Sequence, residues 1–494
     1  MAYLPQPIWY SCGLAAFPPI VLDNHSDTPI YKQIADSLVS LIENGQIGAG
    51  ARLPATRELA GQLKLNRATV SAAYALLEES GFIQGHVGRG SFVAGRVASQ
   101  PVRDALPVRS SHEIAINFAS SRPAAEAFPL LSFRRLSKAV IDSPETAEIL
   151  QLGSPLGYGP LRRYLLRKEQ AEGVARPEDD LMVTNGCQQA LDLLARSLAA
   201  NGGTVIYEDP VYHGLLRVFA RAGVRTIPVP VGPAGIDLDA LEEVFTRQKG
   251  HWLVVTPSFQ NPTGVTLPLE ARKRLVAWAQ KSGVTLVEND IYSELRYLGD
   301  PLPTLKQLDG SGKTILLRSY SKIAFPGLRV GWVTAPREII ARLTEEKQIS
   351  DLHSDQLAQA IFLRFAESGE LAEHIGRTRE AGRARLEAAF RACEEFWPEG
   401  TKWTRPEGGM CLWMELPAPL TAETLLREAR AEGIDFLPGP NFSLGSAHSR
   451  SLRISFGGLP PETITRGLQI LGNIASAELN NHNSLHLEPA AALV

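Results

Sequence analysis

Short apolar runs that alternate with helical stretches are the feature that most constrains the fold of this chain. Helical patterns at 188–198 and 269–281 lie between several of the runs. Strands that alternate with helices form a mostly parallel sheet with helices on both faces. We therefore predict an α/β domain from 113 onward, with apolar runs at 181–183, 205–207, 252–256, 285–287, 315–317 and 329–334.

The pattern changes past Glu345, where long charged helices precede short strands. The helices expected there span 358–367 and 371–392, and the strands span 409–416 and 453–456. This change predicts a smaller α+β lobe after the sheet.

Polar side chains follow several of the predicted strands. Because ligands of such sheets bind at the carboxyl ends of the strands, these residues are expected to share one site. The segment 185–188 also opens a helix, so its N–H groups suit a phosphate. Any one of these motifs is usually only a turn, but their succession in chain order indicates a site. They are Asn185 to Gln188, Tyr212, Asn261 to Gly264, Glu288 to Tyr292, and Ser319 with Lys322.

The segment Ser319-Tyr320-Ser321-Lys322 places an amine just after a strand. A buried lysine can lose its proton and react with an aldehyde. Arg329 follows one short turn later, and an arginine near small hydroxylated side chains binds phosphate. An aldehyde that carries a phosphate describes pyridoxal 5'-phosphate (PLP). Taken alone, the segment also fits a solvated lysine on a surface turn.

Residues 26–95 carry a second, smaller pattern. Apolar residues at helical spacing predict one helix from Ile30 to about 44, a second capped by Thr56 that ends near Leu63, and a third capped by Asn66. Apolar runs at 82–83 and 91–93 flank a glycine-bearing turn, which predicts a β-wing. Two helices joined by a tight turn form a helix-turn-helix.

Five of the six basic side chains of this module lie on the second and third helices, their approach and the wing, whereas three of its six acids, Asp27, Asp36 and Glu43, lie at the first helix. The polar residues Asn66, Arg67, Thr69 and Ser71 are expected to face the major groove. The pattern alone also fits a three-helix interaction module without DNA. The five basic residues are Arg52, Arg57, Lys64, Arg67 and Arg89.

Composition sets limits on the remaining possibilities. The net charge of −3 gives no general attraction to nucleic acid, and the four cysteines include no CxxC pair. No apolar run reaches the ~18 residues that a membrane span needs, so we expect a soluble, cytoplasmic protein. The expected divisions are an N-terminal extension (1–25), a DNA-binding domain (26–95), a linker (96–112), a PLP-binding domain (113–475) and a flexible tail (476–494).

The N-terminal motifs resemble the winged-helix domain of the GntR family of bacterial regulators. The resemblance rests on Arg52-Leu-Pro-Ala-Thr-Arg-Glu-Leu-Ala, Asn66-Arg-Ala-Thr-Val and Gly88-Arg-Gly-Ser-Phe-Val. It implies that Arg52, Arg57, Arg67 and Thr69 contact phosphates or bases of a double-stranded operator. It also implies that Gly90 lets the wing approach the DNA backbone closely.

The strand-end motifs together resemble the fold-type I PLP enzymes, the aspartate aminotransferase-like superfamily. The resemblance implies that Lys322 forms the internal aldimine with PLP, and that Arg453 binds the carboxylate of a substrate or effector. It also implies a homodimer, and hence two DNA half-sites. The remaining implied contacts are Arg329, Ser319, Gly186, Cys187 and Gln188 with the phosphate, Tyr212 with the ring, and Asn261 and Tyr292 with its O3'.

One position departs from this superfamily. An aspartate three residues before the tyrosine normally faces the pyridine nitrogen, and here Asn289 stands at that spacing before Tyr292. Asp290 is the next residue, which points the other way on a regular strand but reaches the nitrogen if the strand bulges. Asn289 would give the ring only a neutral hydrogen bond and weaken carbanion chemistry.

With a winged helix in front, the chain resembles the MocR-type regulators, in which an aminotransferase-like domain serves as a PLP-dependent sensor. The first hypothesis is a bacterial regulator, bound to the nucleoid DNA, that senses an amine or amino acid through Lys322 and PLP. The second is a working aminotransferase with an appended DNA-binding domain. The third is a DNA-binding protein whose large domain is a PLP-free dimerisation scaffold.

Overall fold

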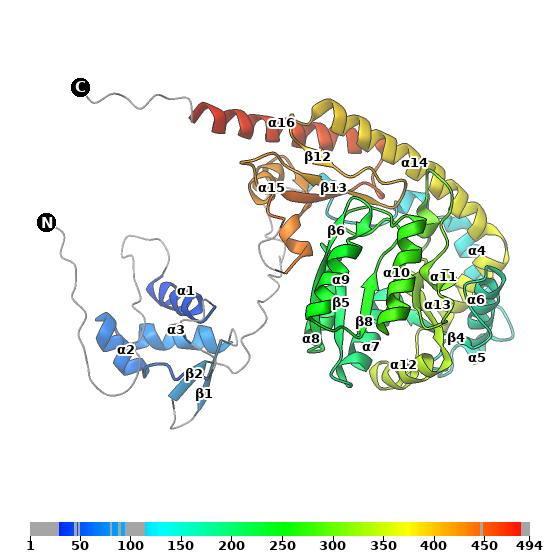
Figure 1. Ribbon diagram of the computed structural model, residues 1–494, viewed down its shortest axis with the longest axis horizontal. Coiled ribbons are helices and arrows are strands. Elements are labelled where there is room, and N and C mark those ends of the chain that lie inside the picture. Colours follow the sequence, from blue (N-terminus) through cyan, green and yellow to red (C-terminus); the bar gives the residue numbers. More distant parts are fainter. Residues whose placement is uncertain are drawn as a thin grey trace. The chain divides into compact units, whose positions relative to one another are not determined.

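The structure is a computed structural model that divides into two compact units, Met1–Val108 and Arg109–Val494 (Figure 1). It describes residues 29–43, 47, 50–79, 82–86, 90–93, 114–444 and 448–485. The predicted N-terminal extension (1–25) and the predicted linker (96–112) lie outside these residues.

The N-terminal unit has the winged helix-turn-helix fold predicted for it. Helices α1 (Ile30–Glu43), α2 (Thr56–Leu63) and α3 (Arg67–Glu79) precede the antiparallel hairpin of β1 (Ile83–His86) and β2 (Gly90–Val93). A stripe of apolar residues on α3 packs against Ile34 and Leu38 of α1 and Leu59 of α2. That stripe consists of Val70, Ala73, Tyr74 and Leu77, all of them buried.

The helices of this unit differ in whether a side chain caps their first turn. Asn66 Oδ1 accepts a hydrogen bond from the Ala68 N–H at 2.9 Å, as expected of a capping side chain. The predicted cap at Thr56 is wrong, because Thr56 is the first helical residue and Ala55 holds the N-cap position without a side-chain bond. Lys64 turns the chain between α2 and α3 with a left-handed backbone (φ 54°).

The large lobe of the C-terminal unit is built on an eight-stranded sheet of order β4-β11-β10-β9-β8-β5-β6-β7. Strand β11 is antiparallel to both neighbours and β7 is antiparallel to β6, whereas the other pairs are parallel. The mostly parallel sheet was predicted. The strands are β4 (Asp179–Asn185), β5 (Thr204–Asp209), β6 (Arg225–Gly232), β7 (Gly235–Ile236), β8 (Trp252–Val255), β9 (Thr285–Asp290), β10 (Ile315–Ser319) and β11 (Val330–Pro336).

Helices cover both faces of this sheet. On one face, α7 (Cys187–Ala199), α8 (His213–Arg221) and α12 (Arg337–Ser350) pack on strand residues such as Val254 and Leu317. Helices α9 (Leu238–Arg247) and α10 (Leu269–Ser282) pack on the other face, where α6 (Gly159–Ala171) and α13 (Gln356–Glu367) also lie. The shorter elements are β3 (Ile116–Asn117), α4 (Leu130–Ile141), α5 (Thr146–Ile149), α11 (Leu305–Leu308), η1 (Ala125–Ala127), η2 (Ser293–Leu295) and η3 (Pro326–Leu328).

The small lobe contains the four-stranded antiparallel sheet β12-β13-β16-β15. The long helices α14 and α16 lie side by side over it (Figure 1). Helix α16 continues to Leu485, so the tail predicted to begin at 476 is helical for its first part. The elements are α14 (Glu370–Phe396), β12 (Lys402–Trp403), β13 (Cys411–Glu415), α15 (Ala422–Ala431), β14 (Ile434–Asp435), β15 (Leu437–Pro438), η4 (Gly439–Phe442), β16 (Ser451–Ser455) and α16 (Pro461–Leu485).

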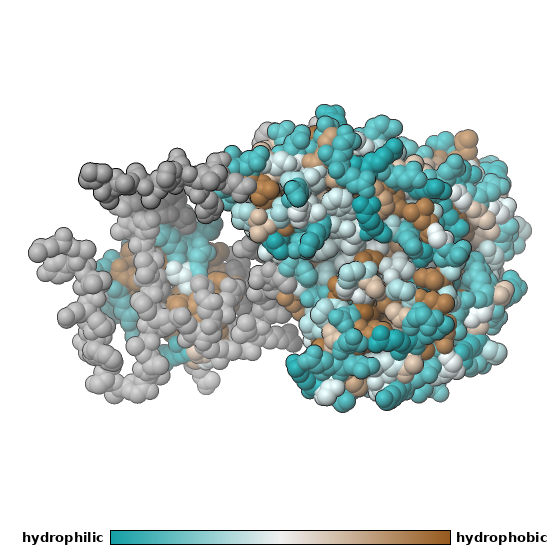
Figure 2. Space-filling view, turned by 45° about the horizontal axis from the view of Figure 1, so that its top comes forward, coloured by the Kyte–Doolittle hydropathy of each residue, from teal (hydrophilic) through white to brown (hydrophobic). Residues whose placement is uncertain are grey.

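Apolar side chains also reach the surface of the C-terminal unit, where Figure 2 shows brown patches between hydrophilic residues. None of the helices in the described part of the chain has the length and apolar character that a membrane crossing requires. The exposed large apolar side chains of this unit are Leu130, Leu131, Ile141, Leu150, Leu152, Leu298, Ile349, Leu352 and Leu444.

Candidate functional site

Lys322 lies in the turn that follows β10, between the two lobes. Its Nζ donates a hydrogen bond to the Ser121 carbonyl oxygen at 2.7 Å, and no acid among the described residues is bonded to it. Burial, together with the nearby Arg453 guanidinium, lowers the pKa of Lys322 to about 8. A substantial fraction of this amine is therefore neutral near physiological pH, which is the form that attacks an aldehyde.

A cationic pocket forms where α7 begins. Arg329 has a left-handed backbone (φ 56°) and donates from Nη2 to the Asn185 carbonyl at 2.9 Å. Gly186 sits directly against it, because a Cβ built at Gly186 would lie 2.5 Å from Arg329 Nη2. The 13-residue helix α7 starts at Cys187, so its free N–H groups point toward the same place. A phosphate fits these donors.

Two serines connect Arg329 to the lysine segment. Ser319 Oγ donates to the Val330 carbonyl at 2.9 Å and bonds Ser321 Oγ at 2.9 Å. Ser321 Oγ in turn accepts from Arg329 Nη1 at 3.4 Å. Ser319 was predicted as a phosphate contact and Ser321 was not, although the spacing of two between these serines was a usable signal.

On the opposite side of Lys322, Asn261 joins the two lobes. Its Nδ2 donates to Tyr292 Oη at 3.3 Å, and its Oδ1 accepts from Arg453 Nη1 at 2.9 Å. Arg453 Nη2 also donates to the Ala119 carbonyl, while its guanidinium lies 5.0 Å from the centre of the Phe442 ring. Burial raises the pKa of Tyr292 and lowers that of Arg453.

The predicted ring partner Tyr212 ends the loop after β5. Its ring covers Gly214, where a Cβ would lie 2.3 Å from Tyr212 Cε1. Gln188 Nε2 donates to the Gly214 carbonyl at 3.3 Å, and its buried Oε1 has no partner among the described residues. Cys187 is buried, which raises the pKa of its thiol, so the neutral thiol prevails.

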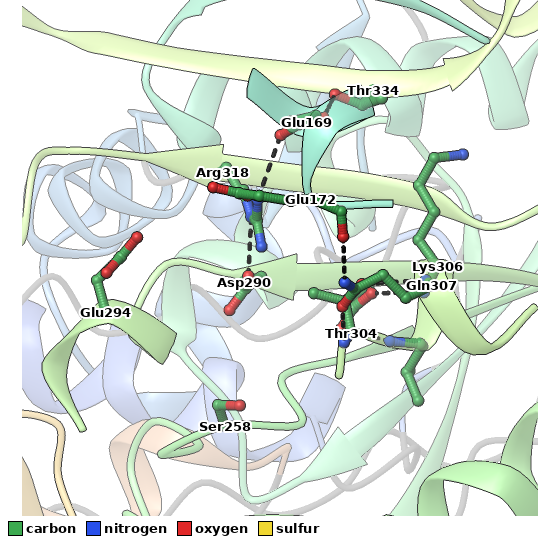
Figure 3. Close-up of polar contacts among 12 residues, drawn as sticks. Glu169, Glu172, Ser258, Asp290, Glu294, Thr304, Lys306, Gln307, Arg318 and Thr334 are labelled. Atoms are coloured by element: carbon green, nitrogen blue, oxygen red, sulfur yellow. Dashed lines mark hydrogen bonds and ion pairs between the residues drawn. The ribbon is translucent and has the colours of Figure 1, made fainter. Parts of the chain in front are cut away.

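Asn289 and Asp290 point to opposite faces of β9. Asn289 pairs in register with Leu317, and its Nδ2 lies 3.4 Å from Thr256 Oγ1 on the face that α7 covers. Asp290 pairs in register with Arg318 and accepts from its Nε at 2.9 Å on the other face. Figure 3 shows Arg318 between Asp290 and Glu169. No bulge interrupts this register.

The residues on the α7 face fit PLP in several respects. The Gly186 and Arg329 cradle suits the phosphate, the Lys322 amine suits the aldehyde, and Asn261 with Tyr292 suits a ring oxygen. Asn289 Oδ1 is buried without a partner among the described residues, as expected of a group that bonds a ligand atom. The sequence motifs predicted all of these side chains. They did not predict Ser321 or Ser121, and the Ser121 contact is made by a backbone carbonyl, which leaves no sequence signal.

The predicted DNA-contacting side chains of the N-terminal unit lie at its surface. Arg52, Arg57, Asn66, Arg67 and Ser71 are exposed, and Thr69 is half-buried. Gly90 has φ +99°, and a Cβ at this position would lie 3.2 Å from Arg52 Nε. Arg52 bridges Phe92 of the wing through its backbone, so the approach to α2 and the wing form one surface.

Comparisons with known proteins match both units. The family described as bacterial regulatory proteins, gntR family, matches residues 30–93, and the family described as aminotransferase class I and II matches 114–471. The 2-aminoadipate transaminase of Thermus thermophilus is 37% identical over 383 residues, which cover 77% of this chain and 94% of that protein.

A regulator and a solved structure extend these matches. The probable rhizopine catabolism regulatory protein MocR of Rhizobium meliloti is 28% identical over 503 residues, which cover 96% of this chain and 99% of that protein. The crystal structure of kynurenine aminotransferase from Pyrococcus horikoshii with PMP has a TM-score of 0.72 and 32% identity, and covers 75% of this chain and 92% of that chain. The chain therefore belongs to the class I and II aminotransferase family and, through its gntR-type domain, to the MocR-type transcription regulators with a PLP-binding domain.

Proposed function

We propose that this regulator senses an amine or amino acid at Lys322 and converts its binding into a change in DNA affinity. The observation that carries the proposal is the amine of Lys322 with a lowered pKa, set between a phosphate cradle and Arg453. In the proposal, the Lys322 amine would hold PLP, Arg329 and the start of α7 would hold its phosphate, and the bound cofactor would supply the aldehyde with which an amino compound reacts.

Arg453 is the proposed effector-binding residue. It stands on β16 of the small lobe, and it bonds Asn261 of the large lobe and the Ala119 carbonyl. A carboxylate that binds this guanidinium competes with both bonds, so it alters the contact between the lobes. An effector shifts a conformational equilibrium only through different affinities for two states, and these competing bonds supply such a difference.

Asn289 favours a sensor over an efficient enzyme. We place Asn289, rather than Asp290, against the pyridine nitrogen, since Asp290 is engaged with Arg318 on the other face of β9. An amide cannot hold a proton on that nitrogen as a carboxylate does, so the ring is a weaker electron sink. Binding and exchange of an amine need no such sink, whereas transamination does.

A second candidate function is transamination itself. Several relatives of the large domain bear the names of aminotransferases, such as the 2-aminoadipate transaminase above and an aromatic-amino-acid aminotransferase of Thermococcus litoralis, 34% identical over 391 residues. Half-transamination of the PLP-loaded protein with a panel of amino acids tests this candidate.

We further propose that the protein acts as a homodimer on two DNA half-sites. The support is the set of exposed apolar side chains on α4, after α5 and at the end of α12. Leu131, Leu152 and Ile349 are 80% exposed or more, and burying such side chains against a second copy would be favourable. Sedimentation of the full chain tests this association.

The regulator function is tested by measuring the affinity of the PLP-loaded full chain for the DNA upstream of its own gene. The standard amino acids and simple amines are added one at a time. At least one compound is expected to change the affinity by about tenfold, a typical coupling between sites. Arg453→Gln should retain basal DNA binding but lose the response to amino acids. Failure of the wild type to bind this DNA would contradict the proposal.

A further inference from the structure

A cavity of about 190 Å³ lies behind Lys322, at the junction of the two lobes. Its walls come from α14, from 123–128, from Lys322 and Ile323, and from Met410 and Gly457 of the small lobe. None of the groups proposed to hold PLP lines it except Lys322. The cavity is therefore a separate space that shares one wall with the cofactor site.

The charged side chains that line this cavity are basic. Lys322, Arg377 and Arg385 line it together with His374, and the lining includes no Asp or Glu among the described residues, while Glu126 lies near enough to Arg385 to raise its pKa. The remaining walls are mainly apolar, among them Phe128 and Leu295. An apolar space with cationic side chains favours an organic anion over a cation or a neutral polar molecule.

The two Nη atoms of Arg385 are hydrogen-bond donors that the protein leaves available in this cavity. Arg385 donates from Nε to the Leu459 carbonyl at 2.9 Å, but its two Nη atoms make no hydrogen bond or ion pair among the described residues. Burial lowers the pKa of Arg385, which means that its charge is poorly solvated there. Arg385 is half-buried, and a guanidinium whose Nη donors have no protein partner among the described residues can bind a carboxylate through two parallel bonds.

His374 supplies an independent indication of a ligand. Its side chain is 2% exposed, its Nε2 bonds the Ile323 carbonyl at 2.9 Å, and its Nδ1 has no partner among the described residues. Such an orphan nitrogen is uncommon in a protein interior and calls for a bonding group. It can accept from a hydroxyl or, once the ring is protonated beside an anion, donate to a carboxylate.

The position of the cavity connects it to the lysine. His374 bonds the residue that follows Lys322, and α14 packs on α13 in the large lobe and on α16 in the small lobe. A molecule that occupies this space contacts both lobes and the Lys322 segment at once. Its binding therefore couples to the arrangement of the proposed sensor site.

We propose that this cavity is a second ligand site, which binds a small carboxylate with an apolar body through Arg385 and His374. The site is distinct from Arg453, where the carboxylate of the amine effector is proposed to bind. The proposal does not depend on the regulator function, because it concerns a binding equilibrium that is measurable without DNA.

Calorimetric titration of the PLP-loaded full chain with benzoate tests the site, with benzamide as the neutral probe of the same shape. Benzoate should bind saturably, and benzamide should bind at least about tenfold more weakly, because it lacks the charge that Arg385 pairs with. Arg385→Gln should weaken benzoate binding by at least about tenfold. Ala381→Leu fills the cavity without removing the Arg385 bond to Leu459, and it should have a similar effect.

Two control variants locate the binding. Arg383→Gln removes an exposed arginine of the same helix, paired with Glu387, and should leave benzoate binding unchanged. Arg453→Gln should retain saturable benzoate binding, because Arg453 does not line the cavity. Benzoate binding that is lost in Arg453→Gln but retained in Arg385→Gln and Ala381→Leu would overturn the proposal, and so would the absence of saturable binding to the wild type.

Discussion

The two units of this chain hold their cationic side chains in opposite environments. In the N-terminal unit, Arg52, Arg57 and Arg67 are exposed to solvent. In the C-terminal unit, Lys322 bonds a carbonyl oxygen, and Arg453 is 3% exposed and bonds Asn261 and Ala119. Exposed charges act additively and are screened by salt, whereas the charges inside the protein depend on specific partners. Substitution of one cation in the first unit should therefore lower DNA affinity by a limited factor. Substitution in the second unit should abolish the response to amino acids.

The largest effect is expected for Lys322→Ala, which removes the proposed covalent attachment of PLP. The variant should lose the response of DNA affinity to amino acids completely, while basal DNA binding by the separate winged helix remains. Gel-shift titrations with and without amino acids measure both. Lys313→Ala, at an exposed lysine, is the control and should behave as the wild type. A full response in Lys322→Ala would show that sensing does not require this amine.

A faster half-transamination is expected for Asn289→Asp. A carboxylate at this buried position would keep the pyridine nitrogen protonated, so half-transamination should accelerate by about 10- to 100-fold. Stopped-flow absorbance of the PLP-loaded protein with an amino acid measures this rate.

Asp290→Asn is the matched variant for that test. It removes the Arg318 ion pair on the other face of β9, so it should lower stability without raising the rate. An unchanged rate in Asn289→Asp, combined with a loss of cofactor chemistry in Asp290→Asn, would identify Asp290 as the ring partner instead.

A moderate effect is expected in the N-terminal unit. Arg67→Ala removes an exposed charge at the start of α3. If Arg67 contacts a base, the loss should weaken DNA binding by about 1–3 kcal/mol. If it contacts only a phosphate, the loss should also reduce the salt dependence of the DNA affinity. Lys32→Ala, an exposed change on α1, should have little effect. Equal losses for the two variants would contradict the proposed orientation of α3 in the groove.

The smallest effect concerns pH. The pKa of Lys322 is lowered to about 8 from 10.5, so its neutral fraction rises with pH and saturates above about 8. The rate of PLP attachment to the cofactor-free protein should follow this curve, and Arg453→Gln should move its midpoint upward because a neighbouring positive charge is lost. A rate that keeps rising to about 10.5 would show an unperturbed amine.

Much of the fold was predictable because its strands are buried on both faces and appear as apolar runs, as at 252–255 and 315–317. Strand β6 was missed because Pro228 and Pro230 interrupt its apolar residues, and both point to its exposed side. The expected strand start at Arg329 was one residue early, because the left-handed turn places this side chain in the phosphate cradle.

The side chains of the candidate site were predictable for a similar reason, since they follow strands whose ends meet. Their backbone partners were not predictable. The Ser121 carbonyl that accepts from Lys322 comes from 201 residues earlier in the chain, and a carbonyl is common to every residue type. Asn289 and Asp290 were expected to point to opposite faces of a regular strand, but only the register with β10 excludes a bulge here.

The central claim is that the Lys322 amine holds PLP. Borohydride reduction of the PLP-loaded protein, followed by mass spectrometry of its peptides, tests this claim most directly. The account predicts a pyridoxyl group on the peptide that carries Ser319 to Lys322. Reduction that leaves this peptide unmodified, or that places the group on a different lysine, would contradict it.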